Sequence, residues 1–145
     1  MNLILSPSPL QLRLYGFSGL AGNNDDAAKA MALSHRVWEY LRNKGIKNKG
    51  KNIWVYDADH FVFAGVELEA DTPVVDTLEE YAVCLDKYVR YKHIGPYAMI
   101  QKKGKEMRQE LINRGYSILF PYLEIYGHPT IDESQLETDL IMAIR

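Results

Sequence analysis

The most informative segment of the chain reads Phe120-Pro121-Tyr122-Leu123-Glu124-Ile125-Tyr126. It is short, aromatic and β-branched, and Gly127 follows it, so it predicts a β-strand. Because side chains alternate between the faces of a strand, one face would carry Leu123 and Ile125 as ordinary core residues. The other face would carry Phe120, Tyr122, Glu124 and Tyr126. Burying a carboxylate in such an aromatic row is costly unless something compensates its charge, so this face predicts a ligand site.

Composition indicates one folded domain. The chain has 145 residues, of which 47% are hydrophobic and 25% charged, a balance that suits a single domain with a sizeable core. The formal net charge of −2 argues against direct nucleic-acid binding, which usually comes with a basic excess. No segment matches a signal peptide or a membrane span. We therefore expect a cytoplasmic protein with no membrane contact.

Metal and cofactor motifs are missing from the sequence. The single cysteine, Cys84, excludes a disulfide framework or a site with several cysteine ligands, and its place between Val83 and Leu85 predicts a small buried residue. No two of the four histidines are spaced as a zinc motif requires. We also find neither a glycine-rich phosphate loop nor a nucleophile elbow. The sequence thus predicts no metal and no cofactor.

Periodicity predicts two helices among strands. Apolar residues recur at helical spacing from Ala27 to Leu41, and Gly45 is placed to end that helix. A second helix follows Gly95-Pro96 and ends at Gly115. The expected strands cover residues 10–17, 53–56, 61–68, 81–85, 88–94, 120–126 and 138–144.

This order of elements suggests a duplication. Residues 41–45 (LRNKG) match residues 111–115 (LINRG), each at the end of a helix that precedes two strands. We therefore predict an α+β fold in which two β-α-β-β pseudo-repeats, at about 9–70 and 78–145, form one domain over residues 1–145. The two units would make a curved antiparallel sheet, with two helices on one face and a ligand cleft on the other.

The C-terminal half resembles a known family. It resembles the GyrI-like, or AraC-type effector-binding, domain in the order of four features. These are the segment His93-Ile94-Gly95-Pro96-Tyr97, a helix, the segment 121–126 (PYLEIY), and an acidic residue before a closing apolar strand. The resemblance covers most of the chain and is most specific from His93 to Ile144. It implies a duplicated β-α-β-β fold with a central ligand cleft. It also implies that Glu124 matches the pocket glutamate that faces cationic aromatic ligands in drug-sensing members, and that Tyr126 matches the aromatic residue beyond it.

Two features depart from that family. Many members carry a tryptophan in the second helix, where this chain has residues such as Lys105 and Glu106. Only a few residues precede the first expected strand, which leaves no room for a helix-turn-helix segment. The sequence thus predicts a stand-alone version of the domain rather than a complete transcription factor.

Further side chains are candidates for the walls of the cleft. Tyr122 and Tyr126 share a face with Glu124 if the strand is regular, and Phe120 extends the same row. For all of these aromatic residues the alternative is ordinary packing in the sheet. His93 would either organise the turn at Gly95-Pro96 or form a hydrogen bond beside the cleft. The remaining candidates come from the other central strands: Trp54, Phe63 and Tyr91.

These residues leave several functions open. The first is binding of a small organic molecule that is apolar or aromatic, with or without a positive charge. The protein would sequester this molecule or signal to a separate regulator protein. The second is hydrolysis of small electrophilic compounds, in which Glu124 would act as general base and Tyr126 or His93 would polarise the substrate. The third is a protein-interaction module of the gyrase-inhibitor type. Edge strands would permit either a monomer or a homodimer.

Overall fold

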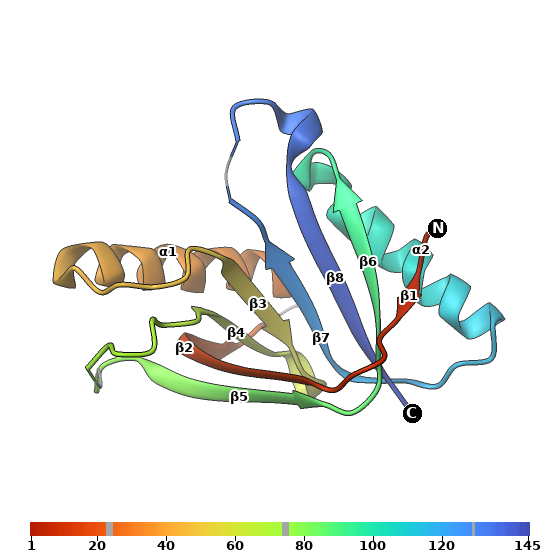
Figure 1. Cartoon of the computed structure of the whole chain (residues 1–145), viewed down its shortest axis with the longest axis horizontal. Helices are drawn as coiled ribbons and strands as arrows, with labels where there is room; N and C mark the ends of the chain where they lie inside the picture. The colour runs from red at the N-terminus through yellow and green to blue at the C-terminus, as the bar shows by residue number, and fades with distance from the viewer. Residues whose placement is uncertain (23–24, 74–75, 129) are drawn as a thin grey trace.

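The chain folds as an α+β protein with an open antiparallel sheet and two long helices. The computed structural model describes residues 1–22, 25–73, 76–128 and 130–145 (Figure 1). The fold class predicted from the sequence is confirmed. The strands are β1 (Ile4–Leu5), β2 (Leu10–Leu20), β3 (Asn52–Tyr56), β4 (Phe61–Val66), β5 (Glu79–Leu85), β6 (Tyr88–Ile94), β7 (Ile118–Tyr126) and β8 (Glu137–Ile144). The helices are α1 (Asp26–Lys44) and α2 (Ile100–Asn113), with short 3₁₀ turns η1 (Ala58–His60), η2 (Tyr97–Met99) and η3 (Glu133–Gln135).

The eight strands form one sheet in the order β1-β6-β8-β7-β3-β4-β2-β5. The order strand-helix-strand-strand occurs twice along the chain, as β2-α1-β3-β4 and as β6-α2-β7-β8. The two groups of strands meet where β3 pairs with β7, and they spread apart from that line (Figure 1). Strand β1 departs from this grouping, because it precedes β2 in the chain but pairs with β6 in the second group.

Local sequence explains both helices. Asp25 caps the start of α1 by accepting a hydrogen bond from the Ala28 backbone N–H at 3.2 Å. Gly45 ends α1 in the left-handed conformation, with φ of 62°, that glycine adopts without steric cost. The sequence predicted the second helix directly after Gly95-Pro96, whereas the short turn η2 comes first and α2 begins at Ile100. No helix in the described part of the chain is long and apolar enough to cross a membrane.

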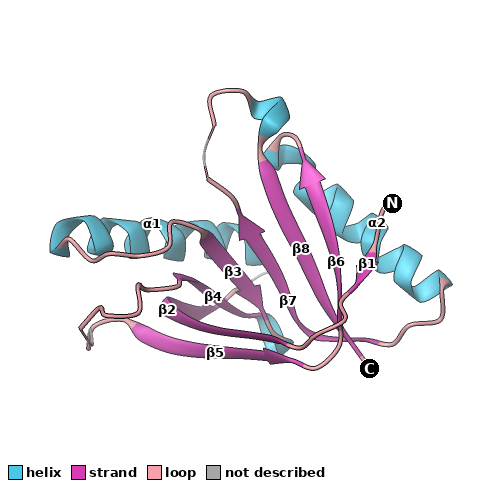
Figure 2. Cartoon of the chain, viewed as in Figure 1, coloured by secondary structure: helices cyan, strands magenta, loops and turns pink. Residues whose placement is uncertain are grey.

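Each face of the sheet carries its own apolar cluster. Both helices pack on one face, where Val37 of α1 and Met107 of α2 belong to the same cluster as Trp54 and Leu140 of the sheet. The second cluster lies on the opposite face and runs across the neighbouring strands from β8 to β5, with Leu14, Val83 and Ile141 among its members. Figure 2 shows the two helices over different parts of the sheet.

One detail of the predicted architecture is wrong. We expected the cleft on the face opposite the helices, but the main cavity is lined by residues of both α1 and α2 as well as by strands. The cavity therefore lies on the same face as the helices. The opposite face carries the second apolar cluster instead.

Two local predictions also differ from the structure. Cys84 is exposed rather than buried, because it lies on the edge strand β5 and alternates with the buried Val83 and Leu85. Strand β7 is not regular at its start: its register with β8 shifts between Leu119 and Tyr122, where the Phe120–Pro121 peptide is cis. Phe120 is 58% exposed.

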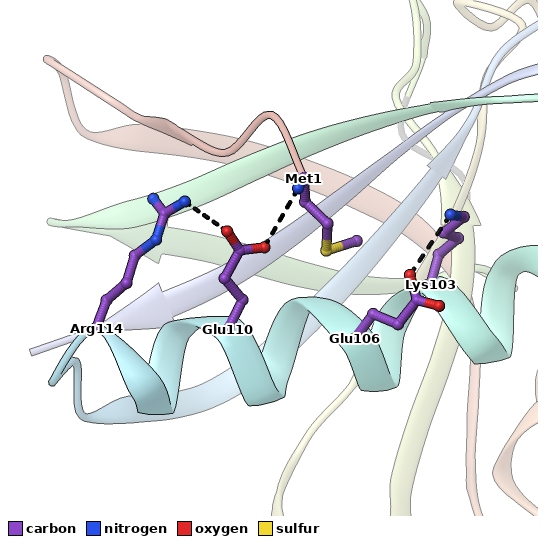
Figure 3. A network of polar contacts seen from close by, with 5 residues as sticks. All are labelled: Met1, Lys103, Glu106, Glu110 and Arg114. Carbon is purple, nitrogen blue, oxygen red and sulfur yellow. Dashed lines mark hydrogen bonds and ion pairs between the residues drawn. The ribbon is translucent and has the colours of Figure 1, made fainter.

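Helix α2 also carries charged contacts, one of which connects it to the first residue of the chain (Figure 3). The carboxylate of Glu110 lies between the amino group of Met1, at 3.6 Å, and the guanidinium of Arg114. Nearer the start of the helix, Lys103 pairs with Glu106 at 3.4 Å. None of these helix residues lines the main cavity.

Candidate functional site

The candidate site is a cavity of about 1160 Å³ between the two helices and the centre of the sheet. This volume is slightly larger than the range of roughly 300–1,000 Å³ that small-molecule sites occupy. Strands β3, β7 and β8 supply the floor, the start of α1 supplies one side, and η2 with α2 supplies the other. The floor residues are Asn52, Trp54, Tyr56, Tyr122, Glu124, Tyr126 and Met142.

Glu124 lies at the centre of the floor and is 6% exposed. Three tyrosine hydroxyls donate hydrogen bonds to its carboxylate. Tyr126 reaches Oε1 at 2.8 Å, Tyr122 reaches Oε2 at 2.9 Å, and Tyr56 reaches Oε1 at 3.3 Å. Both oxygens are therefore engaged, and in the described part of the chain no basic side chain forms an ion pair with this carboxylate.

Burial and hydrogen bonding act on Glu124 in opposite directions. Burial raises the pKa of its carboxyl, since the charged form loses hydration, and this effect dominates. The hydrogen bonds from Tyr126, Tyr122 and Tyr56 lower the pKa, because they stabilise the carboxylate, and they offset part of the rise. Burial and the nearby carboxylate in turn raise the pKa of each of these tyrosines, so their hydroxyls stay protonated and act as donors.

Aromatic rings surround this carboxylate. Tyr56 stacks on Tyr122 with ring centroids 5.7 Å apart, while Trp54 packs against Tyr126 at 4.8 Å. The ring of Tyr97 from η2 forms a T-shaped pair with that of Tyr126, with the centroids 5.2 Å apart. The faces of such rings attract cations. The cavity thus combines an apolar, electron-rich wall with one buried acid.

The structure brings some of the predicted residues into the cavity and places others elsewhere. Four of the predicted residues line the cavity together: Trp54, Tyr122, Glu124 and Tyr126. Phe63 is on the opposite face of the sheet, where it stacks on Tyr81 and is 1% exposed.

The other three candidates also lie outside the lining. Phe120 points to solvent at the irregular start of β7. Tyr91 packs against the helix-side cluster from β6, two strands away from Glu124. His93 is buried, and its Nε2 donates a hydrogen bond to the Pro96 carbonyl oxygen at 3.1 Å, which is the turn-organising role considered above.

Sequence reasoning missed three aromatic residues of the cavity. Tyr56 shares strand parity with Trp54, and that parity could have identified it. Tyr97 follows Pro96 directly, but nothing in the sequence indicates that η2 turns it toward the sheet. Trp38 was assigned to the core and is half-buried at the edge of the cavity. Among the described residues, no cluster of three or more histidine, cysteine or acidic side chains could hold a metal ion.

Comparisons with known proteins place the fold. No protein-family model and no curated protein matches the chain. Solved structures do match over nearly its whole length. They include the structure of SAV2435 bound to tetraphenylphosphonium, at 17% identity and a TM-score of 0.66, covering 100% of this chain and 94% of that one. At such identities the likeness establishes a shared fold.

Two further structures have the same fold. The C-terminal domain of EcmrR matches at 12% identity with a TM-score of 0.69, and the match covers 99% of this chain and 97% of that one. A hydrolase from Listeria innocua matches at 12% identity with a TM-score of 0.57 and covers 99% and 91%. The fold therefore occurs both in a protein bound to an organic cation and in one described as a hydrolase.

Proposed function

We propose that this chain binds a small aromatic cation in the cavity around Glu124, and that it sequesters or senses this ligand. The observation that carries the proposal is a buried carboxylate held by three hydroxyl donors, enclosed by aromatic rings and without a basic partner in the described residues. A ligand cation would supply the missing countercharge, and the rings would add cation–π attraction.

A related fold supports this class of ligand. SAV2435 has been solved with tetraphenylphosphonium, a large aromatic cation. The EcmrR C-terminal domain has the same fold, and EcmrR has been solved in a complex with DNA, which supports the proposal that this chain senses its ligand for a regulator. The GyrI-like resemblance described above agrees with both features.

The test compares two probes of the same shape and opposite charge. Tetraphenylphosphonium should bind the wild type by calorimetry and raise its melting temperature, whereas tetraphenylborate should do neither. Glu124→Gln should weaken phosphonium binding at least about tenfold, because it removes the buried countercharge. Glu137→Gln, an exposed glutamate on the neighbouring strand β8, is the matched control and should bind as the wild type does.

The outcomes separate the rival functions. Equal binding of both ions, or binding that is unaffected by Glu124→Gln, would overturn the proposal. The hydrolase alternative predicts that esters or lactones are consumed by the wild type and not by Glu124→Gln, which product analysis of the same mixtures would detect. A gyrase-inhibitor type of module would instead retain a protein partner regardless of the residue at position 124.

A further inference from the structure

The wall of the cavity formed by α2 is polar and basic. One face of the helix lines the cavity with residues at helical spacing, namely Gln101, Gly104, Lys105 and Arg108. The apolar residues Ile100, Met107 and Leu111 form the adjacent face that packs on the sheet. Helix α2 therefore presents two positive charges to a cavity whose floor carries one buried negative charge.

These two basic residues have no protein partner in the described structure. Both Lys105 and Arg108 are exposed, and neither takes part in a salt bridge or a side-chain hydrogen bond there. Two other basic residues nearby differ in this respect, since Lys103 pairs with Glu106 and Arg114 with Glu110 (Figure 3). Within the described residues, α2 therefore turns two unpaired cations toward the cavity.

The acidic residues on the opposite side are already engaged. Asp25 accepts the capping hydrogen bond of α1 at 3.2 Å, and Asp26 contacts Nδ1 of His60 at 3.0 Å. Both line the cavity at the α1 side. An anionic group on a ligand would be repelled by this side and attracted by α2, so the charge pattern defines one orientation.

From this pattern we infer that the ligand is a zwitterion: a cationic aromatic group on Glu124, and a carboxylate, sulfonate or phosphate held by Lys105 and Arg108. This inference rests on the proposed function, because the cationic end needs the Glu124 site. A ligand with a positive charge alone would satisfy the floor but would face two uncompensated like charges on α2. A ligand with both charges satisfies the floor and the wall together.

The test uses two phosphonium ions of similar length, carboxybutyl-triphenylphosphonium and pentyl-triphenylphosphonium. Only the first carries a carboxylate. At low salt the wild type should bind the carboxylate form about threefold to tenfold more tightly, the range expected for two exposed ion pairs. The preference should shrink as ionic strength rises, because exposed charges are screened.

Variants locate the effect. The double substitution Lys105→Gln with Arg108→Gln should abolish the preference for the carboxylate form and leave binding of the pentyl form equal or tighter. Lys102→Gln removes an exposed charge from the same helix outside the cavity lining and should retain the preference. Both variants should melt near the wild-type temperature, since the substituted side chains are exposed.

The two proposals fail in different ways. If both phosphonium ions bind and Glu124→Gln weakens both, yet the carboxylate gives no preference, the zwitterion inference is wrong and the cation site stands. The zwitterion inference is equally wrong if the preference survives in the double variant. If neither ion binds, or if binding ignores Glu124→Gln, the proposed function fails and this inference fails with it.

Discussion

Trp54 of β3 and Glu124 of β7 are directly opposite one another in the central strand pair of the sheet. Their side chains share the helix-side face, so the indole lies beside the buried carboxylate on the cavity floor. This pair joins the two groups of strands and places an aromatic face next to the charge. Changes to the charge of Glu124 or to the rings around it should therefore alter ligand binding.

Cation affinity should depend on pH through Glu124. Because burial raises the pKa of this carboxyl, its charge is lost at a higher pH than for an exposed glutamate. Affinity for tetraphenylphosphonium should be full above the raised pKa and fall as pH decreases through it. Titration calorimetry at several pH values would show this fall in the wild type and a flat profile in Glu124→Gln. A wild-type profile as flat as that of the variant would contradict the assignment.

The stability of the unliganded protein should depend on pH in the opposite sense. A carboxyl whose pKa is higher in the folded than in the unfolded state holds its proton longer when folded. Its contribution to stability is therefore fully present below the unfolded pKa and is lost as pH rises through the folded pKa. Thermal unfolding in this window should show the wild type losing stability relative to Glu124→Gln as pH increases. A gain relative to the variant would have the wrong sign.

Removing one hydroxyl should shift the charge state of Glu124. Tyr126→Phe deletes the 2.8 Å hydrogen bond that favours the carboxylate, so the pKa of Glu124 should rise further. Phosphonium affinity near neutral pH should fall about threefold to tenfold, and the pH midpoint of binding should move upward. The matched control is Tyr81→Phe, which removes a 2.7 Å bond to Asp57 outside the cavity lining and should leave the midpoint in place.

Gly104 should act on the site through Tyr122. A Cβ atom at this position would lie 3.3 Å from the Tyr122 hydroxyl, closer than most real contacts, so the hydroxyl would have to move. Alanine would favour the helix by about 1 kcal/mol relative to glycine. Gly104→Ala should therefore keep or raise the melting temperature while it weakens phosphonium binding.

A double-mutant cycle tests this coupling. In the Tyr122→Phe background the hydroxyl is gone, so adding Gly104→Ala should have little further effect on affinity. Independent, additive losses from the two substitutions would show that Gly104 acts by another route.

Trp54 and Phe63 should separate binding from stability. Trp54→Leu removes a ring from the cavity and should weaken phosphonium binding, with a cost in stability as well because the indole is buried. Phe63→Leu alters the cluster on the other face and should lower stability by about 1 kcal/mol while affinity is retained. Calorimetry and thermal unfolding of both variants would measure the two quantities side by side. Loss of affinity in Phe63→Leu alone would reverse this assignment.

Much of the fold could be predicted because its signals are local. Local patterns in the chain indicate the apolar stripe of α1, its end at Gly45 and most of the strand segments. The central position of Glu124 among aromatic residues also follows from the alternation of β7. The pattern of one strand does not indicate which face of the sheet the helices cover. For this reason the cleft was predicted on the wrong face.

The individual misplacements have a similar cause. Trp54 pairs with Ala64 rather than with Phe63, so the register of the β3–β4 hairpin puts the two candidate aromatics on opposite faces. A register shift of one residue would reverse that result, and the sequence alone does not specify it. At Phe120, the irregular pairing of β7 with β8 breaks the alternation on which its assignment depended.

The junction of β3 with β7 has a consequence for how the candidate site could be divided. Trp54 and Tyr56 precede the turn between β5 and β6, whereas Tyr122, Glu124 and Tyr126 follow it. A chain cut at that turn would yield two fragments, neither of which holds a complete floor. Ligand recognition would then depend on reassembly of the fragments along one strand pair, with β1 reaching across to β6 as a second attachment. The cavity would thus serve as a reporter of fragment complementation.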